Sequence, residues 1–121
     1  MGKFYRGLYE DLSLFVRHSA WLNAVPEELK RKGPRMSRLE QLRKARKDEE
    51  YAPEMPLVEG AGHLLGYLWE IGPTVLAGMG AGPISYMELV AWQGLTGVVL
   101  RPWEVRFLRR LSYDYLSESY R

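Results

Sequence analysis

The sequence predicts an all-α domain of about four to five helices, and three observations carry this prediction. Apolar residues recur at steps of three and four positions over several stretches, which is the spacing of one buried helix face. A serine followed three positions later by a glutamate, which is a helix-start signal, precedes two helical stretches. No stretch long enough for a strand alternates apolar and polar residues. The 121 residues, of which 46% are hydrophobic, suit one domain with a single core.

The first predicted helix covers residues 3–25. Its apolar face recurs at helical spacing and consists of Tyr5, Leu8, Leu12, Phe15 and Leu22, widened by Phe4, Tyr9 and Val16. Pro26 ends this helix or begins a new turn, because a proline cannot donate a hydrogen bond inside a helix.

The segment from residue 27 to residue 51 is polar and contains a basic helix. Ser37 and Glu40 form a predicted capping box, in which each side chain accepts a hydrogen bond from the backbone of the other. The basic residues of the helix are Arg38, Arg43, Lys44, Arg46 and Lys47. Its apolar stripe is thin and consists of Leu39, Leu42 and Ala45. Because so thin a stripe buries little area, we expect this helix to be peripheral and mobile, and to lead into a proline-containing linker.

A third helix is predicted over residues 57–71. Its apolar face consists of Leu64, Leu65, Leu68 and Trp69. Three glycines weaken this helix but allow another backbone to approach it closely: Gly60, Gly62 and Gly66. The stretch from Thr74 to Pro83 is so rich in glycine that we expect a loop without regular structure.

Two more helices are predicted after this loop. The first begins at a second capping box formed by Ser85 and Glu88, and it ends near Gly97, a residue that suits a left-handed helix stop. The second begins at Pro102, and Glu104 lies in its first turn, where a negative charge suits the helix dipole. The apolar arc of this last helix consists of Phe107, Leu108, Leu111 and Tyr115.

We expect a single domain over residues 1–121 with two unlike halves. Residues 1–56 hold the N-terminal helix, the basic helix and the linker, and residues 57–121 form a compact helical half. Within that half, the helix over residues 57–71 is expected to pack between the last two helices, because the broadest apolar faces lie there.

No residue set has the composition or spacing of a catalytic, metal or cofactor site. There is no cysteine, which excludes disulfides, thiolate metal sites and a thiol nucleophile. His18 and His63 lack metal-ligand spacing, and we interpret both as surface or helix-end residues. The glycine pattern from residue 60 to residue 66 lacks the preceding strand of a dinucleotide-binding turn. We therefore expect no enzyme activity, no metal and no cofactor.

The charge pattern argues against nucleic acid and membrane as partners. The net charge is +2, and no apolar run reaches the roughly 20 residues of a membrane span. The first residues also lack the apolar core of a signal peptide. Arg106, Arg109 and Arg110 form a basic face on the last helix, and the last two helices have helix-turn-helix proportions. Because the turn between them is longer than usual, we interpret the arginines as a solvated face and keep a DNA-binding regulator as an alternative.

The second half of the chain contains a tryptophan-centred pattern of short runs. They are Gly-Tyr-Leu-Trp-Glu-Ile-Gly-Pro at 66–73, Gly-Met-Gly at 78–80, Ala-Trp-Gln at 91–93, Leu-Thr-Gly at 95–97, Pro-Trp-Glu at 102–104 and Leu-Arg-Arg-Leu-Ser at 108–112. This pattern resembles the small proteins of long-tailed bacteriophages and prophages that are named tail assembly chaperones.

The resemblance implies a non-enzymatic assembly factor. Such a factor binds the long, aggregation-prone tape-measure protein while tail-tube protein assembles around it, and the tail-tube protein is a further expected partner. It acts in the host bacterial cytoplasm, is absent from the mature virion, and is compatible with a homo-oligomer. The alternative from another class is a structural virion component, such as a head–tail connector or a tail-completion protein.

Candidate partner-binding residues are of the types enriched at protein interfaces. They are Trp69, Met79, Met87, Trp92, Trp103, Arg106 and Arg110. We expect at least half of the large side chains among them to lie in the core instead, because a domain of this size needs bulky residues for its own packing.

Overall fold

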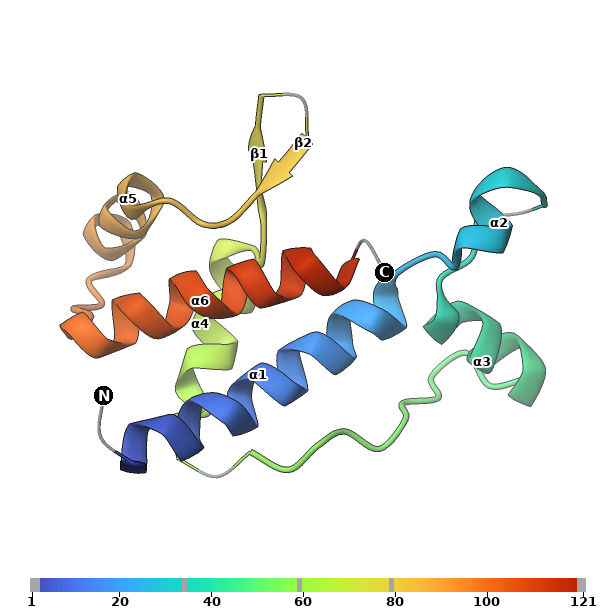
Figure 1. The fold of residues 1–121 in the computed structure, drawn as a ribbon, viewed down its shortest axis with the longest axis horizontal. Helices are drawn as coiled ribbons and strands as arrows, with labels where there is room; N and C mark the ends of the chain where they lie inside the picture. The colour runs from blue at the N-terminus through green and yellow to red at the C-terminus, as the bar shows by residue number, and fades with distance from the viewer. Residues whose placement is uncertain (1–2, 34, 59, 79, 120–121) are drawn as a thin grey trace.

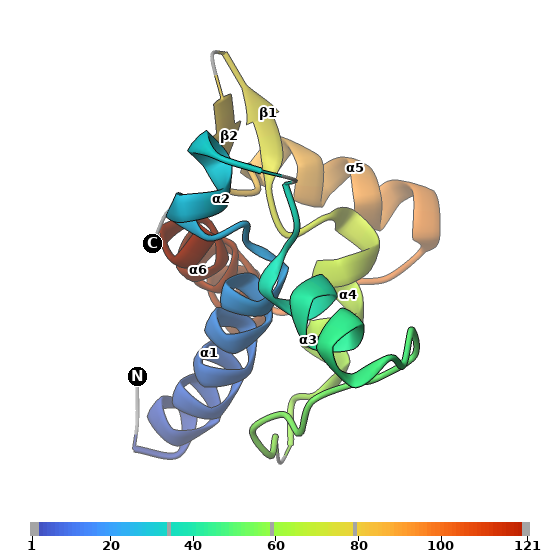
Figure 2. The same ribbon diagram turned by 90° about the vertical axis from the view of Figure 1, so that its right-hand side faces the viewer.

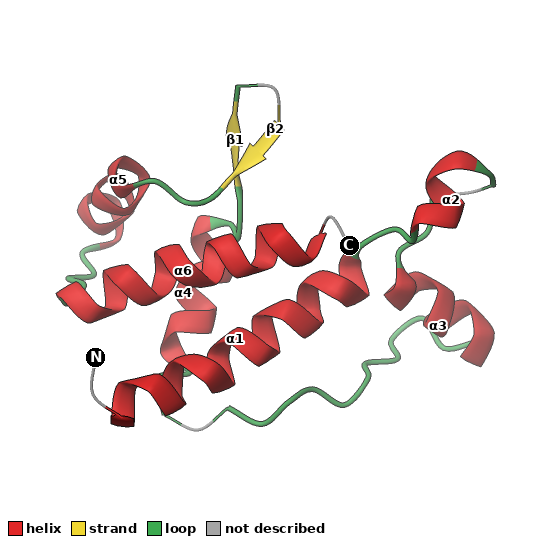
Figure 3. Cartoon of the chain, viewed as in Figure 1, coloured by secondary structure: helices red, strands yellow, loops and turns green. Residues whose placement is uncertain are grey.

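The computed structural model describes residues 3–33, 35–58, 60–78 and 80–119, and it is mainly helical (Figures 1 and 3), which confirms the predicted fold class. The helices are α1 (Lys3–Asn23), α2 (Glu27–Arg31), α3 (Arg38–Arg46), α4 (His63–Ile71), α5 (Tyr86–Thr96) and α6 (Pro102–Ser119). Two short strands, β1 (Val75–Ala77) and β2 (Gly80–Gly82), lie between α4 and α5.

Helices α1 and α6 run side by side in the same direction and form the most extensive helix contact of the fold (Figure 1). Near their N-termini the ring of Tyr5 lies 5.4 Å from that of Trp103. One turn on, the ring of Tyr9 lies 5.3 Å from that of Phe107. The two helices therefore bury their apolar faces against each other over most of their length, which contributes a large share of the hydrophobic stabilisation.

The core extends from this pair to α4 and α5. Its buried members are Tyr9, Leu12, Val16, Leu64, Leu68, Ile84, Leu89, Trp92, Leu100, Phe107, Leu108 and Leu111. Helix α4 contacts both α5 and α6, as expected from its broad apolar face. The sequence did not indicate, however, that α1 would be the principal partner of α6.

Helix α4 begins at His63, so the predicted start at residue 57 is wrong. The backbone φ angles of Gly60 and Ala61 are +67° and +43°, which are left-handed values that a right-handed helix cannot contain. The predicted close backbone packing is also not found at Gly66, where an added Cβ would meet nothing within 4 Å. At Gly60 the tight neighbour is the Leu8 side chain, at 3.0 Å from an added Cβ, rather than another backbone.

The glycine-rich stretch predicted as a loop is a β-hairpin that projects from the helices (Figures 1 and 3). Strands β1 and β2 pair antiparallel, with Val75 opposite Gly82 and Ala77 opposite Gly80. The φ angle of Gly78, at the turn, is +59°, a value that tight hairpin turns require. A Cβ on Gly82 would lie only 2.8 Å from the Ala77 Cβ. The glycines therefore allow the strands to meet instead of preventing regular structure.

The predicted capping box is complete at α3, but at α5 only one of its two side chain–backbone hydrogen bonds forms. Ser37 and Glu40 form the full capping box. At α5 the Ser85 hydroxyl accepts from the Glu88 backbone N–H at 3.2 Å, as predicted. The Glu88 carboxylate accepts from that same hydroxyl at 2.8 Å instead of from the Ser85 backbone. Gly97 ends α5 with a left-handed φ of 77°, as its position in the sequence predicted.

Helix α3 lies at the periphery, as its thin apolar stripe predicted (Figure 2). None of its residues is buried, and it packs against α1. The guanidinium of Arg38 donates to the Trp21 carbonyl at 2.9 Å and lies over the Trp21 ring. The mobility of α3 remains a prediction, as does the division of the domain into two unlike halves.

Glu104 joins the start of α6 to the start of α4. Its carboxylate accepts from the Arg101 backbone N–H at 2.9 Å and lies 2.7 Å from Nε2 of His63. Burial by itself raises the pKa of Glu104, but the Arg101 N–H and the His63 side chain outweigh it and hold the pKa below its ordinary value. The predicted helix-end position of His63 is confirmed, and the residue also contacts another helix through this carboxylate.

We expect Glu104→Gln to lower the free energy of unfolding at pH 7 by about 1–3 kcal/mol, because hydrogen bonds to a charged group contribute roughly this much. The depressed pKa means that the carboxylate stabilises the fold above the pKa of the unfolded chain, and that this contribution is lost as pH falls through the lower folded value. The difference in the free energy of unfolding between wild type and Glu104→Gln should therefore become smaller below about pH 4. Urea denaturation of both proteins at several pH values from 7 to 3 measures this difference.

The exposed Glu70 of α4 provides the control for this measurement. Glu70→Gln should change the free energy of unfolding by less than about 0.5 kcal/mol at any pH. A difference between wild type and Glu104→Gln that stays constant down to pH 3 would contradict the assigned role of the carboxylate.

Candidate partner-binding surfaces

Helix α5 is apolar on both sides, but only one side is buried. Leu89 and Trp92 point into the core. The opposite side, which we call the α5 outer face, consists of Met87, Val90, Ala91, Gly94 and Leu95, all of them exposed. The exposed fractions of its large side chains are 82% for Met87, 67% for Val90 and 88% for Leu95. Their spacing follows the helix repeat, so they form one continuous stripe.

The polar side chains of α5 are bonded within the chain and do not interrupt this stripe. The Gln93 amide donates to the Leu89 carbonyl at 3.1 Å and accepts from the Leu100 N–H at 2.8 Å. The Thr96 hydroxyl donates to the Trp92 carbonyl at 2.7 Å. The α5 outer face itself therefore carries no charge, and the one carboxylate of α5, that of Glu88, lies at its edge and is bonded to the Ser85 hydroxyl. Exposed apolar surface of this kind is typical of a protein-interaction site.

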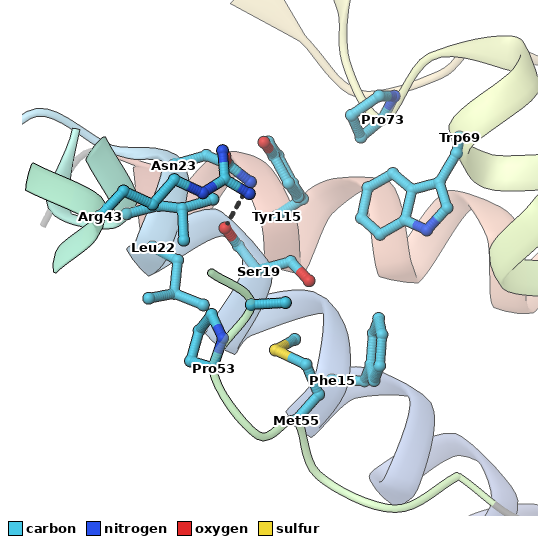
Figure 4. A pocket seen from close by; sticks show the side chains of 12 residues that line it. Phe15, Ser19, Leu22, Asn23, Arg43, Pro53, Met55, Trp69, Pro73 and Tyr115 are labelled. Carbon is cyan, nitrogen blue, oxygen red and sulfur yellow. Dashed lines mark hydrogen bonds between the residues drawn. The ribbon is translucent and has the colours of Figure 1, made fainter. Parts of the chain in front are cut away.

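A second feature is a cavity of about 390 Å³, which none of the residues of α5 lines (Figure 4). It lies between the C-terminal half of α1, helix α3, the extended segment at residues 52–55, and the ends of α4 and α6. Most of its lining is apolar: Phe15, Leu22, Leu39, Ala52, Pro53, Met55, Trp69, Pro73 and Tyr115. Ser19, Asn23 and Arg43 supply the polar part. We call this feature the α1–α3 groove.

The structure separates the predicted partner-binding tryptophans. Trp69 is 39% exposed, packs against the Tyr115 ring and lines the α1–α3 groove. Burial raises the pKa of the Tyr115 hydroxyl in this contact. Trp92 is buried, with its ring 4.9 Å from that of Tyr67. Trp103 is half-buried and packs against Phe107. The two tryptophans on α5 and α6 therefore contribute mainly to the core.

The remaining candidates lie on other elements. Met87 belongs to the α5 outer face, and Met79 lies outside the described residues. Arg106 is exposed on α6. The guanidinium of Arg110 lies 4.1 Å from the centre of the Tyr9 ring, so this arginine is held against α1. The six candidates within the described residues thus do not form one surface.

Sequence reasoning missed Val90 and Leu95 as candidates. The signal was present, since the segment from residue 86 to residue 96 is apolar on nearly every side and its own domain can cover only one of them.

Arg109, on the predicted basic face, donates from Nε to the Ile84 carbonyl at 3.2 Å and lies over the Tyr86 ring. Two of the three arginines of that face therefore have partners within the chain.

Two further findings concern only the described residues. No group of three or more histidine, aspartate or glutamate side chains in this part of the chain could hold a metal ion. None of its helices has both the length and the apolar character that crossing a membrane requires.

Comparison with known proteins identifies one family. The sequence model of the phage tail assembly chaperone family matches residues 41–117. This range begins within α3 and includes α4, the hairpin, the α5 outer face and most of α6. No curated protein and no solved structure matches the chain.

Proposed function

Since the chain belongs to the phage tail assembly chaperone family, we propose that it binds the tape-measure protein during tail assembly and that the α5 outer face is the contact surface. The observation that carries this assignment is the stripe of exposed, uncharged side chains on α5. A long helical client presents apolar side chains at the same helical spacing, and two such stripes can bury each other.

The composition of the α5 outer face suits a helical client. Met87 is flexible and adapts to different partner surfaces. Ala91 and Gly94 are small, and a Cβ added to Gly94 would meet nothing within 4 Å, so a client helix can approach closely there. Burying Met87, Val90 and Leu95 would contribute roughly 5–9 kcal/mol before the entropic cost of association. Association costs about 4–15 kcal/mol, so a micromolar complex, which needs about 8 kcal/mol net, requires further contacts beside these three side chains.

The test is co-expression of this protein with the tape-measure protein of the same phage or prophage, followed by affinity capture and a solubility assay. We expect the wild type to keep the client soluble and to form a complex. Leu95→Gln should weaken the complex at least tenfold, because a loss of about 1.4 kcal/mol corresponds to a factor of ten.

Leu57→Gln is the matched control, since Leu57 is 77% exposed and lies outside α5. This variant should bind the client as the wild type does. If the wild type neither binds the client nor changes its solubility, the proposed client is wrong. If the wild type binds but both variants bind equally well, the client is right and the α5 outer face is not the contact surface.

The proposal also covers location and further partners. The protein acts in the host cytoplasm, is non-enzymatic, is absent from the mature virion, and meets the tail-tube protein as that protein assembles around the client. Mass spectrometry of purified particles tests this part. A stoichiometric amount of the protein in the particle would contradict it and favour a structural virion component.

A further inference from the structure

The α1–α3 groove is a second candidate binding site, separate from the α5 outer face. Helices α5 and α3 lie at opposite ends of the molecule (Figure 1). Side chains from α1, α4, α6 and the extended segment surround the groove, with Phe15 and Trp69 toward one end (Figure 4). Its volume of about 390 Å³ lies in the range, about 300–1,000 Å³, that ligand pockets occupy.

The polar end of the groove contains hydrogen-bond donors. Arg43 and Asn23 lie together there, next to Ser19 (Figure 4). The Asn23 amide donates to the Ser19 carbonyl at 2.9 Å, and Nε of Arg43 donates to the Tyr51 carbonyl at 2.8 Å. These two bonds hold the side chains in place and leave the terminal guanidinium nitrogens of Arg43 without a hydrogen bond among the described residues.

The residues that line the groove carry positive charge and no negative charge. Arg43 is the only charged member of the lining, and no carboxylate of the described residues forms a salt bridge with it. A planar guanidinium with free donors is the side chain best suited to bind a carboxylate. The groove therefore combines an apolar floor with a cationic end.

We propose that the α1–α3 groove binds a peptide segment of a partner protein, with bulky apolar side chains on the floor and an adjacent carboxylate paired with Arg43. Charge complementarity selects an acidic residue over a basic one at that end. The partly exposed Trp69 supplies the aromatic contact that dominates many such interfaces. This inference does not depend on which client the α5 outer face binds.

A pair of synthetic peptides tests this inference on the full chain. One is a capped peptide with two leucines and a phenylalanine around a single glutamate, and the other replaces that glutamate by lysine. Calorimetry gives the affinities, and tryptophan fluorescence with a Trp69→Phe variant locates the site. We expect the glutamate peptide to bind at least fivefold more tightly, and this preference to shrink as salt rises.

Arg43→Gln should abolish the preference for the glutamate peptide. Lys44→Gln is the matched control, since Lys44 is exposed on the same helix and does not line the groove, and it should keep the preference. Circular dichroism verifies that both variants fold. Leu95→Gln should also bind the glutamate peptide as the wild type does. A wrong assignment of the α5 outer face can therefore be distinguished from a wrong assignment of the α1–α3 groove.

Three results would overturn the inference. The first is equal binding of both peptides by the wild type. The second is the absence of binding at millimolar peptide. The third is binding of dodecanoate, an apolar chain with a carboxylate, when neither peptide binds, because the groove would then take a lipid-like acid rather than a protein segment.

Discussion

Leu111→Ala should lower the free energy of unfolding by about 2–5 kcal/mol, the range for truncating a buried leucine. Leu111 lies on α6, has no exposed surface and belongs to the core that α1, α4 and α6 share. The truncation removes apolar contacts and leaves a cavity that the three helices cannot close fully. Equilibrium denaturation in urea, followed by circular dichroism, gives the value.

Leu42→Ala is the companion to this measurement. Leu42 lies on α3, none of whose residues is buried, so its truncation should cost no more than about 1 kcal/mol. If Leu42→Ala proves the more damaging change, α3 belongs to the core in solution and its peripheral placement is wrong.

Ser112→Ala should lower the free energy of unfolding by about 2–4 kcal/mol, although it removes a single oxygen atom. Ser112 is fully buried on α6. Its hydroxyl accepts from the Ile84 N–H at 2.8 Å and donates to the Pro73 carbonyl at 2.7 Å. These two groups flank the hairpin, and the substitution leaves both without this partner, at about 1–3 kcal/mol for the buried Ile84 N–H and less for the partly buried Pro73 carbonyl. Urea denaturation measures the loss.

Ser119→Ala provides the control for Ser112→Ala. The Ser119 hydroxyl donates to the Tyr115 carbonyl at 2.8 Å near the end of the same helix, where water can replace it. This change should cost less than about 0.5 kcal/mol. Equal stabilities of the two variants would show that the Ser112 hydroxyl does not hold the base of the hairpin.

The predictions that succeeded rest on local chemistry. The Ser37–Glu40 capping box, the stop at Gly97 and the start at Pro102 each depend on residues a few positions apart. The wrong predictions, which are the start of α4 and the loop at the hairpin, arise because local sequence shows which backbone conformations a residue can adopt but not which one it adopts. The sequence shows that Gly60 can adopt a left-handed backbone, but not that it does so and delays α4 to His63. It also shows flexibility at Gly78, but not that two strands pair around it.

The sequence alone determined that the chain is helical, where most helices lie, and that its second half resembles tail assembly chaperones. The tertiary structure decided which surfaces remain for a partner. Because α5 is apolar on both sides, its own periodicity could not distinguish Leu89 in the core from Leu95 in solvent. The α1–α6 pairing, the contact of His63 with Glu104 and the α1–α3 groove likewise join residues far apart in the chain. An amphipathic pattern shows that a face is buried, but only packing of the whole chain determines what lies against it.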